Sequence, residues 1–174
     1  MIKSKNLFIT GKPGAGKTTL IKDSVLPYVS EIGGFYTEDI LDENKKRLGF
    51  KLKTFSGSEG ILASKGLKSK NKINKYGVDL QVLENIGVKE MRKTLNENKI
   101  VVIDEIGVIE TLSPVFTEAL LKCITAPNRL LATIRFGAQP FTDEVKAMSD
   151  TSLLVLDREN IVDIKKQVRA WLEN

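Results

Sequence analysis

Two short segments of the sequence combine glycines, a lysine, a hydroxyl and carboxylates in patterns that could do chemistry. The first is Gly11-Lys12-Pro13-Gly14-Ala15-Gly16-Lys17-Thr18, which fits G-x-x-x-x-G-K-[ST] at every fixed position. Glycines permit a turn in which successive backbone N–H groups point inward and form an anion nest. Lys17 would reach the β- and γ-phosphates, and the Thr18 hydroxyl would hold Mg²⁺. The segment therefore predicts a phosphate loop (the Walker A motif) for a magnesium–nucleoside triphosphate.

The second segment is an apolar, β-branched run that ends in two carboxylates, Ile100-Val101-Val102-Ile103-Asp104-Glu105. An acidic residue at the carboxyl end of a buried parallel strand lies on the sheet edge where ligands bind. Asp104 is therefore expected to face the phosphate loop and to hold Mg²⁺ through a water, as a Walker B aspartate does. Glu105 is placed to orient or deprotonate the attacking water.

Together, the two segments define the predicted nucleotide site. Lys17 and Glu105 are its expected catalytic residues, and Thr18 and Asp104 its expected metal ligands. The full predicted set is Gly11, Lys12, Pro13, Gly14, Ala15, Gly16, Lys17, Thr18, Thr19, Ile103, Asp104, Glu105, Ile106 and Gly107.

Four further residues are candidates of second rank. A phosphoryl-transfer transition state spreads charge over its oxygens, so a second cation is expected near the γ-phosphate. Arg135, which follows a predicted strand, is the best candidate, and Arg47 and Arg158 are its rivals. Asn160 is a candidate for contact with the base, although a helix cap explains it more simply.

Composition restricts the chemistry further. The 174 residues contain no histidine, which excludes His-based triads and His-ligated zinc. The one cysteine, Cys123, lies on a predicted apolar helix face and is interpreted as a core residue. The net charge of +5 suits an anionic substrate. Residues 1–174 are interpreted as one domain of a cytoplasmic protein with no membrane partner.

The pattern of apolar residues alternates between strands and helices. Strands are expected at 7–10, 35–41, 48–55, 60–63, 100–103, 129–134 and 153–156, with Gly33-Gly34 as a break. Helices are expected at 17–29, around 88–95, from the Ser113-Pro114 start, around 141–148 and after Asn160. This order predicts an α/β fold with a mostly parallel sheet flanked by helices. The second and third strands read as an antiparallel hairpin inserted after the first helix.

The sequence resembles the THEP-type nucleoside-triphosphatase family from about residue 7 to 165. Besides the two segments above, the likeness rests on Gly33-Gly34-Phe35-Tyr36-Thr37, Arg47-Leu48-Gly49-Phe50, Tyr76-Gly77-Val78-Asp79, Asp104-Glu105-Ile106-Gly107 with Glu110, and Arg158-Glu159-Asn160. The resemblance implies a RecA-like P-loop domain that hydrolyses nucleoside triphosphates slowly with Mg²⁺. It also implies broad base tolerance, with ATP and GTP as substrates and CTP and UTP beside them.

Two other functions stay open at the level of sequence. One is a kinase for a nucleoside or small metabolite, which would form a phosphorylated acceptor together with ADP. The other is a nucleotide-gated switch that binds RNA or protein through the lysines between Lys65 and Lys75 and through the hairpin. A solvated loop is the simpler interpretation of those lysines, so nucleic acid is not favoured. The preferred base and the oligomeric state are not encoded in these motifs.

Overall fold

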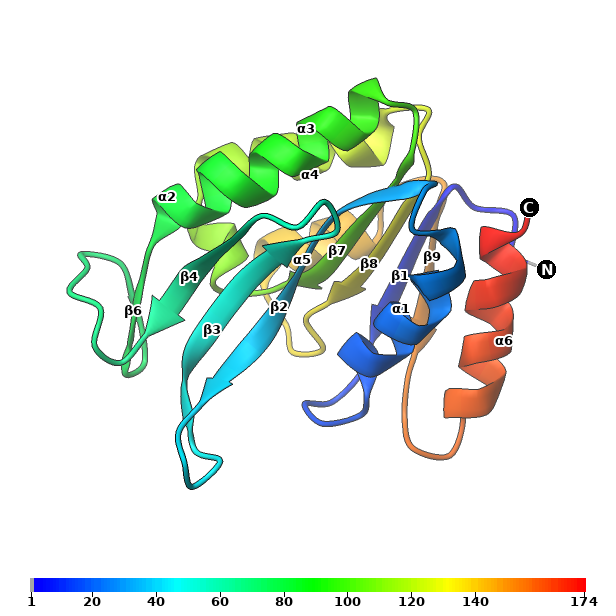
Figure 1. The fold of residues 1–174 in the computed structure, drawn as a ribbon. Helices are drawn as coiled ribbons and strands as arrows, with labels where there is room; N and C mark the ends of the chain where they lie inside the picture. Colours follow the sequence, from blue (N-terminus) through cyan, green and yellow to red (C-terminus); the bar gives the residue numbers. More distant parts are fainter. Residues whose placement is uncertain (1) are drawn as a thin grey trace.

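A nine-stranded sheet forms the centre of the protein in a computed structural model that describes residues 2–174 (Figure 1). The strand order across the sheet is β5-β6-β4-β3-β2-β7-β8-β1-β9. The strands are β1 (Asn6–Thr10), β2 (Ile32–Leu41), β3 (Arg47–Thr54), β4 (Glu59–Ser64), β5 (Lys72–Ile73), β6 (Tyr76–Val78), β7 (Ile100–Ile106), β8 (Leu130–Ile134) and β9 (Thr151–Val155).

The sheet has a parallel half and an antiparallel half. Strands β2, β7, β8, β1 and β9 pair in parallel, so their carboxyl ends meet at one edge. From β2 the sheet continues through β3, β4, β6 and β5, each antiparallel to its neighbour. The predicted hairpin is therefore confirmed as β2 and β3. Its first strand belongs to the parallel half, so the hairpin extends the main sheet.

Helices cover both faces of the parallel half (Figure 1). On one face lie α1 (Lys17–Val25) and α6 (Ile161–Leu172), and on the other lie α3 (Lys89–Asn96), α4 (Pro114–Thr125) and α5 (Pro140–Lys146). The short α2 (Leu80–Val82) lies on that second face too, over β4 of the antiparallel half. Each face has its own hydrophobic core. Leu20 and Trp171 belong to the first, and Phe35 and Phe116, whose ring centroids are 6.2 Å apart, to the second. All five residues of β1 are buried, as expected for a strand covered on both faces.

Three local expectations need correction. The first helix ends at Val25 and passes into a 3₁₀ turn, Leu26–Tyr28, because Pro27 has no N–H to continue the helical ladder. Gly33 and Gly34 lie inside β2 and do not break it. Strand β7 continues to Ile106, so Asp104 and Glu105 are among the last residues of the strand and do not follow its end.

The segment between β6 and β7 is one continuous helical stretch. It runs from α2 through a π-helical segment, Leu83–Val88, into α3. The Asp79 carboxylate caps its start by accepting hydrogen bonds from the backbone of Gln81 and Val82. No helix within residues 2–174 has the length and apolar character needed to cross a membrane.

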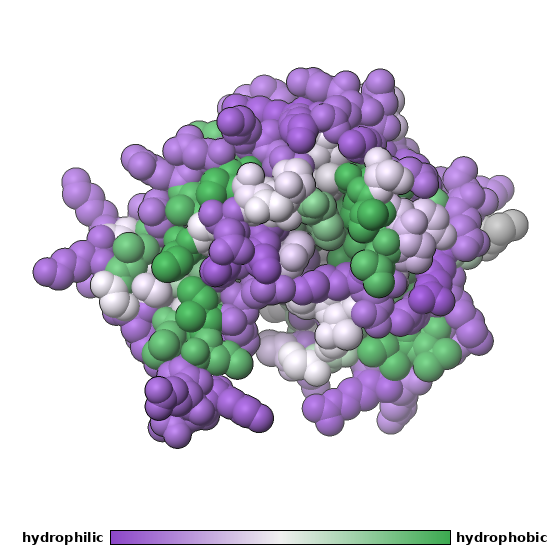
Figure 2. All heavy atoms as spheres, in the orientation of Figure 1, coloured by the Kyte–Doolittle hydropathy of each residue, from purple (hydrophilic) through white to green (hydrophobic). Residues whose placement is uncertain are grey.

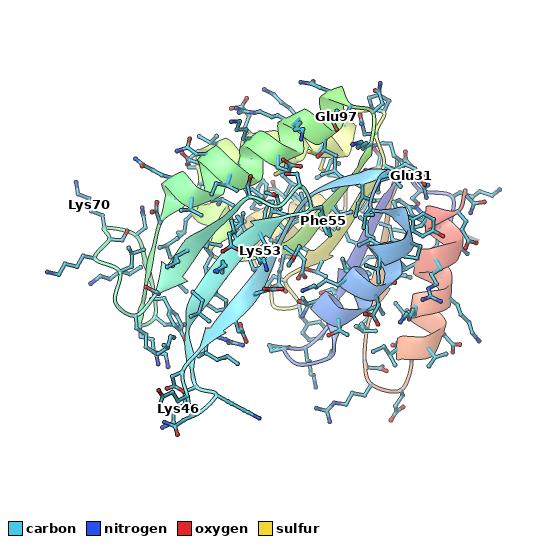
Figure 3. The ribbon with its side chains drawn as sticks, in the orientation of Figure 1. Glu31, Lys46, Lys53, Phe55, Lys70 and Glu97 are labelled. Carbon is cyan, nitrogen blue, oxygen red and sulfur yellow. The ribbon has the colours of Figure 1, made fainter. Side chains whose placement is uncertain are left out.

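Figure 3 labels a lysine in each of two outlying loops of the antiparallel half. Lys46 marks the tip of the β2–β3 hairpin, at the same edge of the molecule as the phosphate loop. Lys70, in the lysine-rich segment, points outward at the far end of the sheet. The outer part of the lysine-rich segment, around Lys70, therefore lies away from the phosphate loop, while Ile73 and Asn74 near its end line the same cleft as the loop.

Candidate active site

The predicted phosphate loop connects β1 to α1 at the carboxyl edge of the parallel strands (Figure 1). Gly16, directly before the helix, has a φ of +95°, a left-handed conformation that side chains rarely adopt. A Cβ atom on Gly11 would lie 2.4 Å from the Leu156 carbonyl oxygen, so glycine is required there by close approach. The loop thus presents its backbone N–H groups and the positive end of α1 to the space in front of it.

Lys17 folds back over this loop. Its Nζ atom donates a hydrogen bond to the Gly11 carbonyl oxygen at 2.9 Å and lies 3.7 Å from a Glu105 carboxylate oxygen. Only 10% of the Lys17 side chain is exposed. The sequence placed these residues in separate segments, and the structure brings the loop lysine and the β7 carboxylate into contact.

Asp104 lies on β7 and is 1% exposed. One of its carboxylate oxygens accepts a hydrogen bond from the Thr133 hydroxyl of β8, while the other is buried and has no partner among the described residues. Burial raises the pKa of Asp104, and the hydrogen bond from Thr133, the nearby Thr18 hydroxyl and the charge of Lys17 act in the opposite direction. A buried carboxylate oxygen without a donor is costly unless something outside the protein binds it.

The donors around Asp104 fit a magnesium ion. The Thr18 hydroxyl is near enough to Asp104 to lower its pKa, and this hydroxyl and the unpaired carboxylate oxygen are hard oxygen ligands of the kind that Mg²⁺ prefers. Within residues 2–174, no three His, Cys, Asp or Glu side chains converge into a preformed metal cage. Magnesium in phosphate-transfer sites is commonly held by one or two protein oxygens together with substrate phosphates, and Thr18 and Asp104 would supply the protein oxygens here.

Glu105 occupies the solvent side of the same site, with 38% of its side chain exposed. Burial raises the pKa of its carboxyl, and the neighbouring Asp104 charge raises it further; Lys17 and, less strongly, Arg135 lower it. A carboxylate with a raised pKa, open to water and beside a phosphate-binding lysine, has the properties of a general base.

Two residues of the site were absent from the predicted set. Glu110 is 5% exposed, accepts a hydrogen bond from the Gly107 N–H at 3.1 Å, and has a pKa that burial raises to about 8. Thr133 carries the hydroxyl that binds Asp104. Thr133 could have been noticed as a polar residue in an otherwise apolar strand. The role of Glu110 depends on the 3₁₀ turn that folds it back under Gly107, which no local pattern predicts.

The predicted set divides into side chains that face the site and side chains that do not. Ile103 and Ile106 are fully buried in the hydrophobic core, so only their backbone can take part. Gly107 lies beside both acidic groups: a Cβ there would be 3.1 Å from Glu110 and 3.3 Å from Glu105. Thr19 lines the cleft described below.

The second-rank candidates separate clearly. Arg135 follows β8, and its positive charge lowers the pKa of Glu105, so Arg135 interacts electrostatically with the site. Arg47 pairs with Asp39 at 2.7 Å on the hairpin, across the cleft. The expected capping role of Asn160 is wrong, because its side chain makes no bond to helix α6. Its amide instead accepts from the Asp157 N–H and donates to the Val155 carbonyl.

A cleft of about 800 Å³ runs from the phosphate loop to the antiparallel half of the sheet. Figure 2 shows the surface hollowed there, between the hairpin tip and the central body. Lys17, Thr18 and Glu105 line one side, and Arg47 and Tyr76 line the other. The cleft is large enough for a polyphosphate together with its attacking water.

Comparison with known proteins finds relatives over nearly the whole chain. The family model described as NTPase matches residues 6–169. The nucleoside-triphosphatase THEP1 of Thermotoga maritima is 40% identical over 167 residues, covering 96% of this chain and 95% of the relative. The human cancer-related nucleoside-triphosphatase is 30% identical over 181 residues, covering 90% of each chain.

Two solved structures share the fold. The crystal structure of THEP1 from the hyperthermophile Aquifex aeolicus superimposes with a TM-score of 0.88 at 31% identity, covering 97% of this chain and 99% of that one. The solution structure of the human protein gives a TM-score of 0.80 at 28% identity, with 96% of each chain covered. The mixed sheet flanked by helices is thus a P-loop NTPase fold, and the chain belongs to the NTPase family.

Proposed function

We propose that this protein hydrolyses nucleoside triphosphates to nucleoside diphosphates and phosphate with the help of Mg²⁺. The single observation that carries the proposal is the contact between the two segments: Lys17 lies 3.7 Å from Glu105 in one cleft. A phosphate-binding lysine and a carboxylate base are thereby placed side by side at the phosphate loop, where a terminal phosphate and its attacking water would meet.

Each residue has a distinct role in this proposal. The loop N–H groups and the Lys17 ammonium bind the phosphates and neutralise the charge that develops on them. Glu105 orients the attacking water and accepts its proton as the bond between the β–γ bridging oxygen and the γ-phosphorus breaks. Thr18 and Asp104 would hold Mg²⁺, which supplies Lewis-acid stabilisation of the β- and γ-phosphate oxygens.

Other groups position these residues. Thr133 orients the Asp104 carboxylate through its hydroxyl, and the second carboxylate oxygen is left buried and without a partner among the described residues. Glu110 fixes the Gly107 N–H and so holds the turn that follows Glu105. Arg135 is the cation proposed to support the charge around Glu105 during reaction.

The proposal is tested by measuring phosphate release from ATP, GTP, CTP and UTP in the presence of Mg²⁺. Glu105→Gln removes the base but keeps the shape, so we expect turnover to fall by roughly 10² to 10⁴ with nucleotide still bound. Lys17→Ala is expected to lose both turnover and affinity, because it removes the phosphate contact itself.

Glu118→Gln and Lys122→Ala serve as matched controls. These residues form an exposed ion pair on α4, outside the cleft, and their variants should keep wild-type rates. Release that is independent of any acceptor and lost only in the two site variants supports hydrolysis at this site. Tight nucleotide binding with no release above the Glu105→Gln background would refute it.

A further inference from the structure

A chain of hydrogen bonds joins the segment after β8 to the turn after β7. The Gln139 side-chain NH₂ group donates to the Thr111 hydroxyl at 2.7 Å, across 28 positions of the sequence. The Thr111 hydroxyl in turn donates to the Gly107 carbonyl oxygen at 2.9 Å. Figure 1 shows β7 and β8 as neighbours, and because they are parallel, the segments that follow them leave the sheet at the same edge.

The direction of these bonds follows from the hydrogens that are available. A threonine hydroxyl has one hydrogen, and a carbonyl oxygen can only accept. The Thr111 hydrogen therefore belongs to the Gly107 carbonyl or to the more distant Val108 carbonyl at 3.3 Å. Gln139 must then be the donor to Thr111, which turns its amide oxygen the other way. That oxygen is buried without a partner among the described residues, so the bond to Thr111 is kept although it leaves an acceptor unpaired.

Gly107, at one end of this chain, packs against the proposed base. A Cβ atom on Gly107 would lie 3.3 Å from a Glu105 carboxylate oxygen and 3.1 Å from a Glu110 one. The Gly107 N–H is held by Glu110, and its carbonyl accepts from both the backbone N–H and the hydroxyl of Thr111. Glu105 therefore rests against a glycine whose N–H and C=O groups are both held in place.

The other end of the chain leads to Arg135. The Arg135 N–H donates to the Ile106 carbonyl at 3.0 Å, where β7 ends. Gln139 then makes the second tie to the same turn through its side chain, and the Asp143 carboxylate of α5 accepts from its backbone N–H. The segment that carries Arg135 is thus fastened at two points to the turn that follows Glu105.

We propose that Gln139 is a positioning residue for hydrolysis: through Thr111 it holds the turn against which Glu105 rests, and it fixes the segment of Arg135 beside that turn. The proposal rests on the hydrolase function proposed above and adds two residues from outside the predicted site. Thr111 and Gln139 are not among the described residues that line the catalytic cleft. Loss of the tie should therefore lower kcat by roughly tenfold to hundredfold, the effect of a small displacement of a catalytic group, and leave the affinity for ADP unchanged.

Thr111→Val tests the hydroxyl, because it keeps the volume and removes the donor. We expect kcat to fall in this variant and to return in Thr111→Ser. Thr125→Val is the matched control. The Thr125 hydroxyl makes the same pair of bonds, to the carbonyls of Leu121 at 2.9 Å and Lys122 at 3.3 Å, but it is exposed at the end of α4. This control should keep the wild-type kcat.

Gln139→Glu separates positioning from packing. A carboxylate has nearly the same shape but can only accept, so the Thr111 hydrogen turns toward it and leaves Gly107. We expect kcat to fall as far as in Thr111→Val, whereas a side chain that only fills space would allow the wild-type rate. Adding Gln139→Glu to Thr111→Val should cause no further loss, because the bond that it redirects is already gone. Gln167→Glu, exposed on α6, is the control for added charge.

Hydrogen–deuterium exchange of residues 106–112 follows the turn without any turnover, and it should be faster in Thr111→Val than in the wild type. Unchanged exchange, a wild-type kcat in Thr111→Val, or additive losses in the double variant would each overturn the positioning role. So would a loss of ADP affinity, measured by calorimetry, as large as the loss of kcat. Failure of the proposed function looks different, because the wild type then releases no phosphate while the difference in exchange persists.

Discussion

At the scale of single residues, the Asp104 carboxylate depends on one hydroxyl. Thr133 is fully buried, and its hydroxyl donates a hydrogen bond to one oxygen of this carboxylate. Thr133→Val keeps the volume but removes the donor, so the carboxylate loses its orientation. We expect the Mg²⁺ concentration for half-maximal turnover to rise by roughly 10- to 100-fold, as for other groups that orient a metal ligand.

Thr133→Ser should restore the magnesium dependence, because it returns the hydroxyl. Thr94→Val is the matched control: Thr94 is equally buried, but its hydroxyl bonds to the Glu90 carbonyl within α3. An unchanged magnesium titration in Thr133→Val would show that the hydroxyl does not prepare the metal site.

A second prediction at this scale concerns the pH dependence of stability. Burial raises the pKa of Glu110 from 4.5 to about 8. Between these values the native state holds a proton that the unfolded chain has lost, so stability falls as pH rises through this window. Glu110→Gln stays neutral and avoids this loss. The variant should gain stability over the wild type, on the order of 4 kcal/mol, between about pH 4.5 and about pH 8.

Urea unfolding of the nucleotide-free proteins at about pH 5 and about pH 8.5 measures this difference directly. The Gln side chain can still accept the Gly107 N–H bond, so the hydrogen bond itself is conserved. A stability difference that is the same at both pH values would contradict a buried, protonated Glu110.

At the scale of elements, the start of α4 is joined to the π-helical segment Leu83–Val88 of the same helical layer. Ser113 is fully buried; its hydroxyl accepts from the Phe116 N–H at 3.1 Å and donates to Glu84 of the π-helical segment at 2.6 Å. Ser113→Ala removes both bonds and leaves a buried donor unsatisfied. The expected loss of unfolding free energy is about 1 to 2 kcal/mol, measured by urea unfolding at neutral pH.

Thr117→Ala is the control within the same helical turn, because the Thr117 hydroxyl only bonds back to the Pro114 carbonyl. That variant should change stability by a few tenths of a kcal/mol. If Ser113→Ala were equally mild, the link between α4 and the π-helical segment would have no energetic importance.

At the scale of the whole molecule, the proposed nucleotide contacts join segments that pack on both faces of the sheet. The phosphate loop leads into α1 on one face, and β7 leads to the Glu110 turn before α4 on the other. Mg²⁺–ADP at about 100 times its dissociation constant should therefore stabilise the native state by about 2.7 kcal/mol. For a chain of this length the melting temperature should rise by roughly 5 to 10 °C.

Differential scanning calorimetry with and without Mg²⁺–ADP measures this shift. Lys17→Ala should abolish it while melting near the wild-type temperature without ligand. A shift that survives in Lys17→Ala would place the bound nucleotide elsewhere in the protein.

Local chemistry explains which features the sequence by itself determined. The glycine spacing and the lysine of residues 11–18 predict a phosphate loop, since few other residues permit that turn. The β-branched run 100–103 predicts a buried strand, and the Ser113-Pro114 pair a helix start, which the structure confirms. In each case the cause lies within a few neighbouring residues, so the pattern is visible without the fold.

Tertiary structure alone decided the remaining features, because they depend on groups that are distant in the sequence. The Asp104–Thr133 hydrogen bond spans neighbouring strands 29 residues apart, and the buried state of Glu110 depends on core packing around it. Asn160 has the residue type of a helix cap, yet competing backbone groups of its own loop take both ends of its amide. The segments after β8 and β9 reach the phosphate loop only because these two strands flank β1 in the sheet, which no stretch of sequence shows.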